Sequence, residues 1–178
     1  RLFAKDGMSV ALAARSAAKL AEFVQVTGCK AFNCDAAKPQ DIDRLFADLD
    51  AAMLTPDVVV YNASYRARGP FTELDPGEVE KALAITAYGA FLVAQAAARR
   101  MLLKGHGAIF FTGASASVHG YAQSAPFAMG KFALRGLAQS MARELHPQGI
   151  HVAHFVIDGG IRSARRPEPA DKPDSLLD

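Results

Sequence analysis

Residues 108–112 read AIFFT, residues 150–157 read IHVAHFVI, and the stretch between them at 124–146 has a helical pattern. Short apolar runs of this kind are typical of strands that are buried on both faces, as in a parallel sheet. A strand, a helix and a second strand of these lengths form a right-handed crossover unit. This stretch therefore predicts parallel strands with helices packed on the sheet.

The same alternation continues toward the N-terminus. We expect strands at 8–14, 30–34 and 57–61, and helices at 16–26, 39–53 and 75–103. Strands that are each joined to the next by a helix predict an α/β domain with a doubly wound parallel sheet and helices on both faces. Ligands of such sheets bind at the carboxyl ends of the strands.

The length of 178 residues indicates a single domain covering 1–178. Residues 1–6 have the pattern of the last turns of a helix that ends at Gly7, so we expect the domain to be incomplete at this end. Residues 162–178 carry three prolines among charged side chains, which predicts a loop or a lid instead of a core element.

The charge balance limits the classes of partner. The chain has 20 Lys and Arg against 18 Asp and Glu, a formal net charge of +2, which disfavours nucleic acid. No run reaches the about 18 uncharged apolar residues that span a bilayer, and the N-terminus has no secretory hydrophobic region. Cys29 and Cys34 do not have metal-ligand spacing. We expect a cytoplasmic protein without a metal site, a membrane or a nucleic-acid partner.

Polar side chains follow three of the predicted strands. Arg15 comes directly after the strand at 8–14, where a cation suits a ribose 2′-phosphate, or it is a solvated residue at a helix N-terminus. Asp35 and the segment Asn62-Ala63-Ser64 follow the next two strands. They either contact a nucleotide in the same crevice or act as an ordinary cap and turn.

Two further segments carry a family resemblance. Residues 111–117 read FTGASAS and residues 126–134 read PFAMGKFAL. In order and spacing they resemble the active-site region of the short-chain dehydrogenase/reductase family, which has a serine after its fifth strand and then Y-x-x-x-K. Asn62-Ala63-Ser64 resembles the N-A-G motif of this family, and residues 158–161 (DGGI) stand where the family carries P-G.

The resemblance implies a Rossmann-like fold, a nicotinamide cofactor and a homodimer or homotetramer. It also implies a strand and a glycine-rich turn before Arg1, and a helix and a strand after Asp178. The family oligomerises through its fourth and fifth helices, and the alanine-rich segment 94–98 would permit such packing, although burial within one subunit explains it equally well.

The motif departs from the family at the proton donor. Lys131 matches the family lysine, which holds the nicotinamide ribose, but Phe127 occupies the tyrosine position, and a phenyl ring has no exchangeable proton. The family serine falls on Ala114, with Ser115 one place later, and the family asparagine falls on Thr86. For Lys131, a solvated helix face is the alternative.

Two hypotheses follow. The first is an NADP(H)-dependent oxidoreductase, with NAD less expected, that acts on an alcohol or carbonyl of a small molecule with weakened proton transfer. The second is a catalytically silent dinucleotide-binding protein that acts as a sensor or assembly subunit. Candidate catalytic residues are Lys131, Ser115 and Phe127, with Tyr121, His119 and Ser124 as other donors. Candidate cofactor-binding residues are Arg15, Asp35, Asn62, Ala63, Ser64, Lys131, Gly159 and Ile161.

Overall fold

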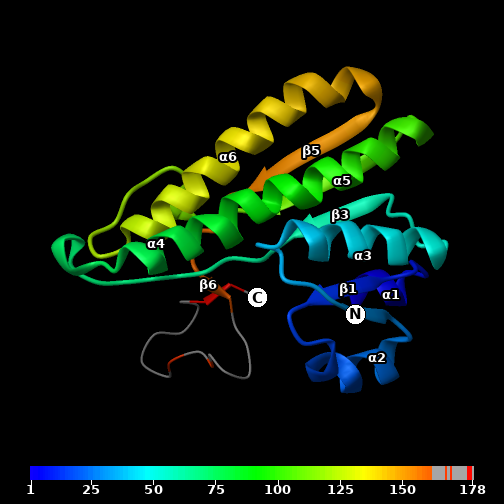
Figure 1. Ribbon diagram of the computed structural model, residues 1–178, viewed down its shortest axis with the longest axis horizontal. Coiled ribbons are helices and arrows are strands. Elements are labelled where there is room, and N and C mark those ends of the chain that lie inside the picture. The colour runs from blue at the N-terminus through cyan, green and yellow to red at the C-terminus, as the bar shows by residue number, and fades with distance from the viewer. Residues whose placement is uncertain (162–166, 168, 170–175, 178) are drawn as a thin grey trace.

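The computed structural model describes residues 1–161, 167, 169, 176 and 177. The predicted alternation of strands and helices is confirmed, and the chain has the α/β class of a Rossmann-like domain (Figure 1). The helices are α1 (Leu2–Lys5), α2 (Ala21–Thr27), α3 (Pro39–Ala51), α4 (Pro76–Leu83), α5 (Gly89–Lys104) and α6 (Ala125–Leu145). The strands are β1 (Ala11–Ala14), β2 (Lys30–Asn33), β3 (Val58–Tyr61), β4 (Gly107–Thr112), β5 (Ile150–Phe155), β6 (Gly160–Ile161) and β7 (Leu176–Leu177).

Short helical turns connect several of these elements. The 3-10 turns are η1 (Ala17–Leu20), η2 (Phe71–Glu73), η4 (Ser115–Ser117) and η5 (His146–Gln148), and η3 (Ala84–Tyr88) is a π-helical turn. The turn η3 divides the single helix that the sequence predicts at 75–103. At this turn the Tyr61 hydroxyl donates a hydrogen bond to the Ile85 carbonyl, and the Thr86 side chain is buried.

All pairings between strands are parallel, but the described strands form three groups where one sheet was expected. β1 pairs with β2, β6 pairs with β7, and β4 lies between β3 and β5. A ladder forms only between strands about 4.8 Å apart, and in the described part of the chain β1 and β3 are not hydrogen-bonded to each other. The predicted parallel α/β class therefore holds, with the hydrogen-bonded strands interrupted between β1 and β3 in these residues.

The helices cover the strands on more than one side. Figure 1 shows α3, α5 and α6 side by side, whereas α2 lies on the side of β1 away from α3. α3 packs against α5, α4 packs against α6, and α6 lies on β5. Most of the core therefore lies between the strands β3–β5 and the layer of α3, α5 and α6.

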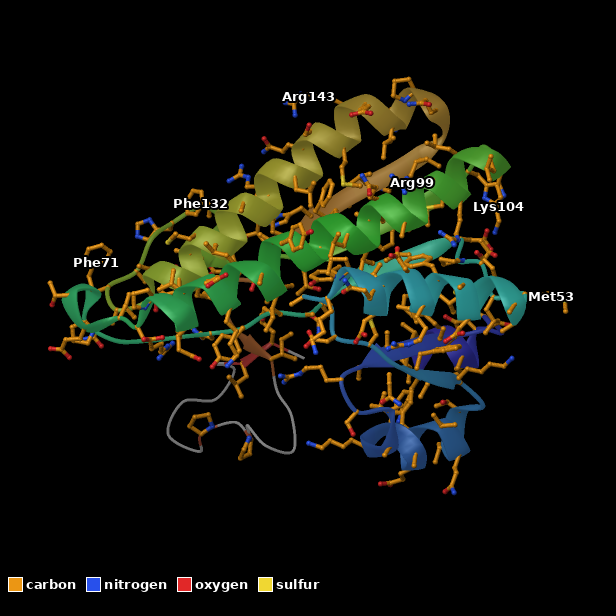
Figure 2. All side chains as sticks on the ribbon, in the orientation of Figure 1. Met53, Phe71, Arg99, Lys104, Phe132 and Arg143 are labelled. Carbon is orange, nitrogen blue, oxygen red and sulfur yellow. The ribbon has the colours of Figure 1, made fainter. Side chains whose placement is uncertain are left out.

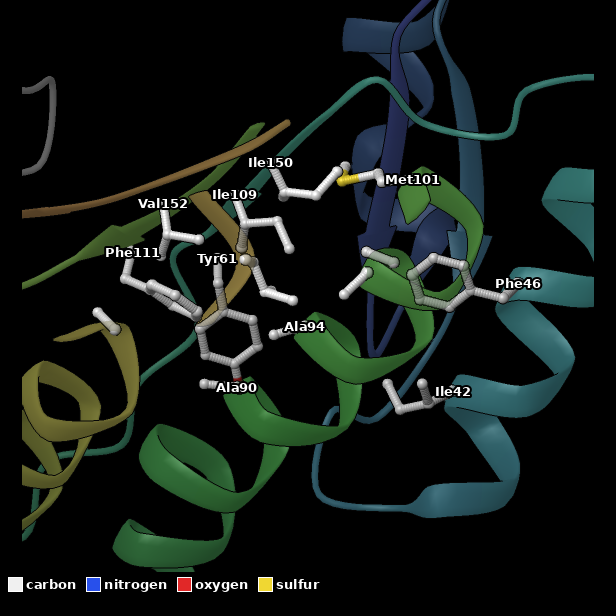
Figure 3. Packing of buried hydrophobic residues seen from close by; sticks show 14 of the residues in the cluster. Ile42, Phe46, Tyr61, Ala90, Ala94, Met101, Ile109, Phe111, Ile150 and Val152 are labelled. Atoms are coloured by element: carbon white, nitrogen blue, oxygen red, sulfur yellow. The ribbon is translucent and has the colours of Figure 1, made fainter. Parts of the chain in front are cut away.

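Buried side chains in this core come from segments far apart in the sequence. Figure 3 shows Phe46 of α3, Met101 of α5 and Ile109 of β4 among them. In the alanine-rich segment, Ala94, Ala97 and Ala98 are buried within the chain. Packing inside one subunit therefore explains these three alanines, and they are not needed for contacts between subunits. Small side chains allow α5 to approach the sheet closely.

The long helical region also bears on the membrane expectation. By length and composition alone, Pro76–Lys104 is apolar enough to cross a membrane. The same region carries core side chains, because Ala90, Ala94 and Met101 are almost fully buried against the strands and helices around them. Its place in the core accounts for part of this apolar composition, since Tyr88, Phe91 and Leu103 of the same region are exposed.

The end of the chain differs from the predicted loop in one place. Leu176–Leu177 forms β7 and pairs in parallel with Gly160–Ile161, so the loop expectation is wrong there. Leu177 packs beside Gly159, where a Cβ would lie 3.1 Å from Cγ of Leu177. For residues 162–166, 168, 170–175 and 178 the loop or lid prediction lies outside the described residues.

Candidate functional site

The candidate site is built on the segment that follows β4. The Gly113 amide donates a hydrogen bond to the Phe155 carbonyl (2.8 Å), and the Ser115 amide donates to the Ile157 carbonyl (2.9 Å). The Ala114 amide donates to Oγ of Ser117 (3.1 Å), which is fully buried. These bonds hold the end of β4 against the segment that follows β5, at the kind of edge where parallel sheets bind ligands.

Helix α6 brings Lys131 to this edge. Pro126 stands in its first turn, which suits a proline because the first amides of a helix have no partner within the helix. Lys131 is 3% exposed, and its Nζ donates a hydrogen bond of 2.6 Å to the Thr112 carbonyl. The alternative of a solvated lysine on a helix face is therefore wrong.

Burial sets the electrostatics of Lys131. Removal from water disfavours the charged ammonium, which lowers the pKa of Lys131 from its ordinary value of 10.5 to about 8. Desolvation is the cause of this shift, and within the described residues Lys131 forms no salt bridge. The amine is therefore close to half protonated near pH 8.

Phe127 lies one helical turn before Lys131 and packs against two cations. The Arg66 guanidinium carbon is 4.5 Å from the centroid of the ring, and Nζ of Lys131 is 5.6 Å from it. Both distances are within the range of cation–π attraction. The ring can hold these cations in place, but it offers no proton to a reacting group.

Thr86, which we expected at the position of the family asparagine, packs against neighbouring segments. It is 1% exposed, its Oγ1 accepts a hydrogen bond of 3.2 Å from the Tyr65 amide, and it lies against Gly130 of α6. A Cβ on Gly130 would lie 3.0 Å from Cβ of Thr86. Thr86 thus joins α6 to the segment after β3.

The other candidate proton donors lie in different surroundings. Ser115 is half-buried in η4, and Ser124 is buried just before α6. His119 and Tyr121 are exposed and contact each other edge to face, with ring centroids 5.1 Å apart. Ser115 therefore has the shortest path along the chain to the end of β4.

The candidate cofactor residues fall into two groups. Arg15, Asn62, Ala63 and Ser64 are exposed and follow β1 and β3, as predicted. Asp35 forms a turn instead, in which its Oδ1 accepts from the Ala37 amide (3.1 Å). Asp35 does not cap α3, whose N-cap is Lys38, and a nucleotide contact at Asp35 stays a prediction.

Gly159 and Ile161 lie beside the end of the chain. Ile161 belongs to β6, which pairs with β7, and Gly159 precedes this strand with φ of +151°. Both residues are exposed, so each can still contact a ligand. Their proposed role in cofactor binding stays a prediction.

His154 is a site residue that the sequence did not single out. It lies on the same face of β5 as Ile150 and Val152, and its imidazole packs directly on Gly113. Its Nε2 is buried without a hydrogen-bond partner among the described residues. Burial lowers the pKa of His154, and the charges of Lys131 and Arg135 lower it further. The sequence offers one signal for this position: in residues 150–154 (IHVAH), His154 has the same parity as the apolar Ile150 and Val152, which predicts the same face of the strand.

An apolar pocket of about 320 Å³ adjoins the start of α6. Its walls come from η2, α4 and α6 and the residues next to them: Phe71, Leu74, Pro76, Val79, Ala125, Pro126 and Met129. None of these side chains is an acid or a base, so the pocket can bind an apolar group but cannot transfer a proton. In the described part of the chain, no three His, Cys, Asp or Glu side chains form a metal-binding group.

The fold and this arrangement define a Rossmann-like domain with a lysine at the strand ends. The family described as enoyl-(acyl carrier protein) reductase matches residues 1–174. The 3-oxoacyl-[acyl-carrier-protein] reductase MabA of Mycobacterium avium is 30% identical over 163 residues, which are 87% of this chain and 63% of that protein. A 3alpha-hydroxysteroid dehydrogenase of Mediterraneibacter gnavus is 33% identical over 120 residues, 66% of this chain and 48% of that protein.

Solved structures agree. A short-chain dehydrogenase from Rhodopseudomonas palustris has a TM-score of 0.79 at 35% identity, covering 86% of this chain and 74% of that one. A gluconate 5-dehydrogenase from Burkholderia cenocepacia, in complex with NADP and tartrate, has a TM-score of 0.81 at 26% identity, covering 89% and 64%. The chain belongs to the short-chain dehydrogenase/reductase family. It spans about half to two thirds of the length of the two curated relatives named above.

Proposed function

We propose that residues 1–178 form the NADP(H)-binding domain of an oxidoreductase that interconverts an alcohol and a carbonyl group of a small molecule. The observation that carries this proposal is the burial of Lys131, whose ammonium is held by the Thr112 carbonyl at the end of β4. A buried lysine without an acidic partner is costly for a fold, which favours a functional reason for it. The named relatives are oxidoreductases.

The residues present fit a nicotinamide dinucleotide. An ammonium has three N–H donors, and Lys131 uses one of them for Thr112, so two can bind the hydroxyl groups of a ribose. Arg15 is an exposed cation directly after β1, where it can pair with a 2′-phosphate, which favours NADP over NAD. We place Asp35, Asn62, Ala63, Ser64, Gly159 and Ile161 in further contact with the cofactor.

The cofactor supplies the hydride when it is bound. The chain must then place the carbonyl, exclude water and deliver a proton. Phe127 cannot deliver that proton, and general acid catalysis contributes about a hundred- to ten-thousand-fold, so we expect reduction to be slower by that order than with a phenol. We propose that the Ser115 hydroxyl, half-buried in η4 shortly after the end of β4, helps to orient the carbonyl oxygen.

A catalytically silent binding protein is the second candidate. The packing of Phe127 against Arg66 and Lys131 favours it, as does the burial of Thr86 against Gly130. At both positions a well-packed side chain replaces a group that the family uses for chemistry. Such a protein would bind the cofactor as a sensor or an assembly subunit.

We propose a homodimer or homotetramer that forms through α5 and α6. The large apolar side chains Tyr88, Phe91, Met129 and Phe132 are exposed on these two helices or next to them. Phe132 points away from the rest of the chain in Figure 2. A self-complementary apolar patch is typical of a twofold interface.

The cysteines fit a location in the cytoplasm. Cys29 and Cys34 are buried and not bonded to each other, as expected in a reducing compartment. Burial raises the pKa of the Cys34 thiol to about 11, which keeps it protonated and unreactive.

Fluorescence titration with NADPH and NADH, followed by assays on a panel of carbonyl substrates, tests the function. We expect tight binding of NADPH, weaker binding of NADH, slow reduction by the natural protein and faster reduction by Phe127→Tyr. Tight NADPH binding without turnover in either protein would favour the silent binding protein. Failure to bind either coenzyme would exclude both candidates.

A further inference from the structure

Two cations contact the ring that stands where a proton donor is needed. Arg66 and Lys131 both lie against Phe127, at 4.5 Å and 5.6 Å from its centroid. A guanidinium stays protonated in proteins, whereas a lysine ammonium can lose a proton. Of these two groups, Lys131 alone can act as an acid and a base.

We propose that the Lys131 amine itself transfers the proton of the reaction, in the place of a phenol, an inference that rests on the proposed function. In the reducing direction the carbonyl carbon receives a hydride, with its electron pair, from the reduced nicotinamide. One N–H bond of the Lys131 ammonium breaks, an O–H bond forms at the carbonyl oxygen, and the electron pair of the N–H bond stays on nitrogen. In the oxidising direction the neutral amine takes the proton of the alcohol back.

The position of the amine supports this role. Its one hydrogen-bond partner among the described residues is the Thr112 carbonyl, at the last residue of β4, and this bond leaves two donors for a ligand. The segment from Gly113 to Ser115 follows directly and is tied to the chain after β5. The amine is thereby held at the strand ends, where a substrate of such a sheet is bound.

The surroundings of the amine make proton transfer possible near neutral pH. Burial lowers the pKa of Lys131 to about 8, so both protonation states are populated between pH 7 and 9. An acid or base works best when its pKa is near the working pH.

The groups that face Lys131 do not restore an ordinary pKa. Arg66 and Lys131 contact the same Phe127 ring, Arg135 stands one turn further along α6, and the His154 imidazole of β5 is close enough for the charge of Lys131 to lower its pKa. Burial lowers the pKa of His154, as do the charges of Lys131 and Arg135, so the neutral imidazole is favoured. A nearby carboxylate would favour the charged ammonium, but no carboxylate in the described residues affects the pKa of Lys131.

Lys131→Arg is the variant that separates proton transfer from binding. Arginine keeps the positive charge and the donors that a ribose needs, but it cannot release a proton. We expect the Kd for NADPH to stay within about threefold and kcat to fall by at least about a hundredfold. Adding Phe127→Tyr to Lys131→Arg should restore kcat by at least tenfold, because a phenol then supplies the proton.

The natural protein provides a test that does not depend on turnover or on the folding of a variant. Its lysines are dimethylated with ¹³C-formaldehyde and each methyl signal is followed by NMR between pH 6 and 12, with exposed Lys19 as the control. We expect Lys131 to titrate near pH 8 and the rate of reduction to fall through the same pH.

The outcomes separate the two proposals. A Lys131 signal that titrates near 10.5, or a kcat that Lys131→Arg leaves within threefold, would overturn the role of Lys131 while NADPH binding still supported the proposed function. Reduction by no form of the protein would also overturn that role. Absence of binding to NADPH and NADH would instead reject the proposed function itself.

Discussion

The His154 imidazole fills the space that a side chain at Gly113 would need. A Cβ on Gly113 would overlap Cε1 and Nε2 of His154, and it would lie 2.7 Å from the carbonyl oxygen of Phe155. In the register between β4 and β5, Phe111 stands opposite His154. The glycine at the end of β4 therefore allows an imidazole to lie within the site beside Lys131.

Gly113→Ala should destabilise the protein by about 1–3 kcal/mol, because its methyl group would overpack against the imidazole and a backbone carbonyl. Urea unfolding measures this loss. Adding His154→Ala should recover only part of it, since the clash with Phe155 remains. Gly136→Ala is the control: nothing lies within 4 Å of that Cβ, and a helical alanine should stabilise by about 0.5–1 kcal/mol. Equal effects of the two substitutions would contradict the packing described.

Lys131→Met should remove a pH dependence of stability. The folded state lowers the pKa of Lys131 from 10.5 to about 8, so the unfolded chain binds more protons between these pH values, and stability rises with pH there. Below pH 8, burying the charged ammonium lowers the free energy of unfolding by about 3 kcal/mol. The hydrogen bond to the Thr112 carbonyl offsets part of this cost. We expect Lys131→Met to be more stable at pH 7 and to lose this advantage near pH 10.5. Lys19→Met, at an exposed position, should change little at either pH.

Arg15→Ser should weaken NADPH binding about ten- to a hundredfold and leave NADH binding within about twofold. A hydrogen bond between charged groups contributes about 1.5–3 kcal/mol, and only NADPH has the 2′-phosphate that the guanidinium would bind. Fluorescence titration of both coenzymes measures the ratio, with Lys19→Ser as the control. A parallel loss for both coenzymes would contradict the selectivity assigned to Arg15.

Arg100→Ala should destabilise the packing of α5 on α3 by about 1–2 kcal/mol. The guanidinium donates from Nε to Asp50 (2.8 Å) and lies 4.9 Å from the centroid of the Phe46 ring. The hydrogen bonds from Arg100 lower the pKa of Asp50, so this contribution is present above pH 3.8 and is lost as the pH falls below it. Thermal unfolding at pH 7 and pH 3 checks both statements. Exposed Arg99→Ala should stay within about 0.5 kcal/mol.

Phe132→Glu should convert the proposed oligomer to monomers, because it places a charge in the apolar patch on α5 and α6. Sedimentation velocity measures the change, and circular dichroism should show unchanged helix content. Val26→Glu is the matched control, since Val26 is 68% exposed in α2, which lies on the side of β1 away from α3. A natural protein that sediments as a monomer would end the proposal of a homodimer or homotetramer.

Local patterns predicted much of the fold. The apolar runs at 30–34, 57–61 and 108–112 each lie at a strand, and the helical pattern at 124–146 matches α6. Hydrophobic periodicity identifies such elements because it depends on neighbouring residues only. That Phe127 has no exchangeable proton likewise follows from the covalent structure of its side chain.

The surroundings of the site residues depended on the tertiary structure. Lys131 is bonded to Thr112, 19 residues away, and Tyr61 is bonded to Ile85 in the π turn, 24 residues away. His154 reaches Gly113 only through the pairing of β5 with β4. Burial and pKa are set by atoms brought together from distant segments. A one-dimensional pattern therefore located Lys131 but left its charge state and its partners to the packing of α6 on the sheet.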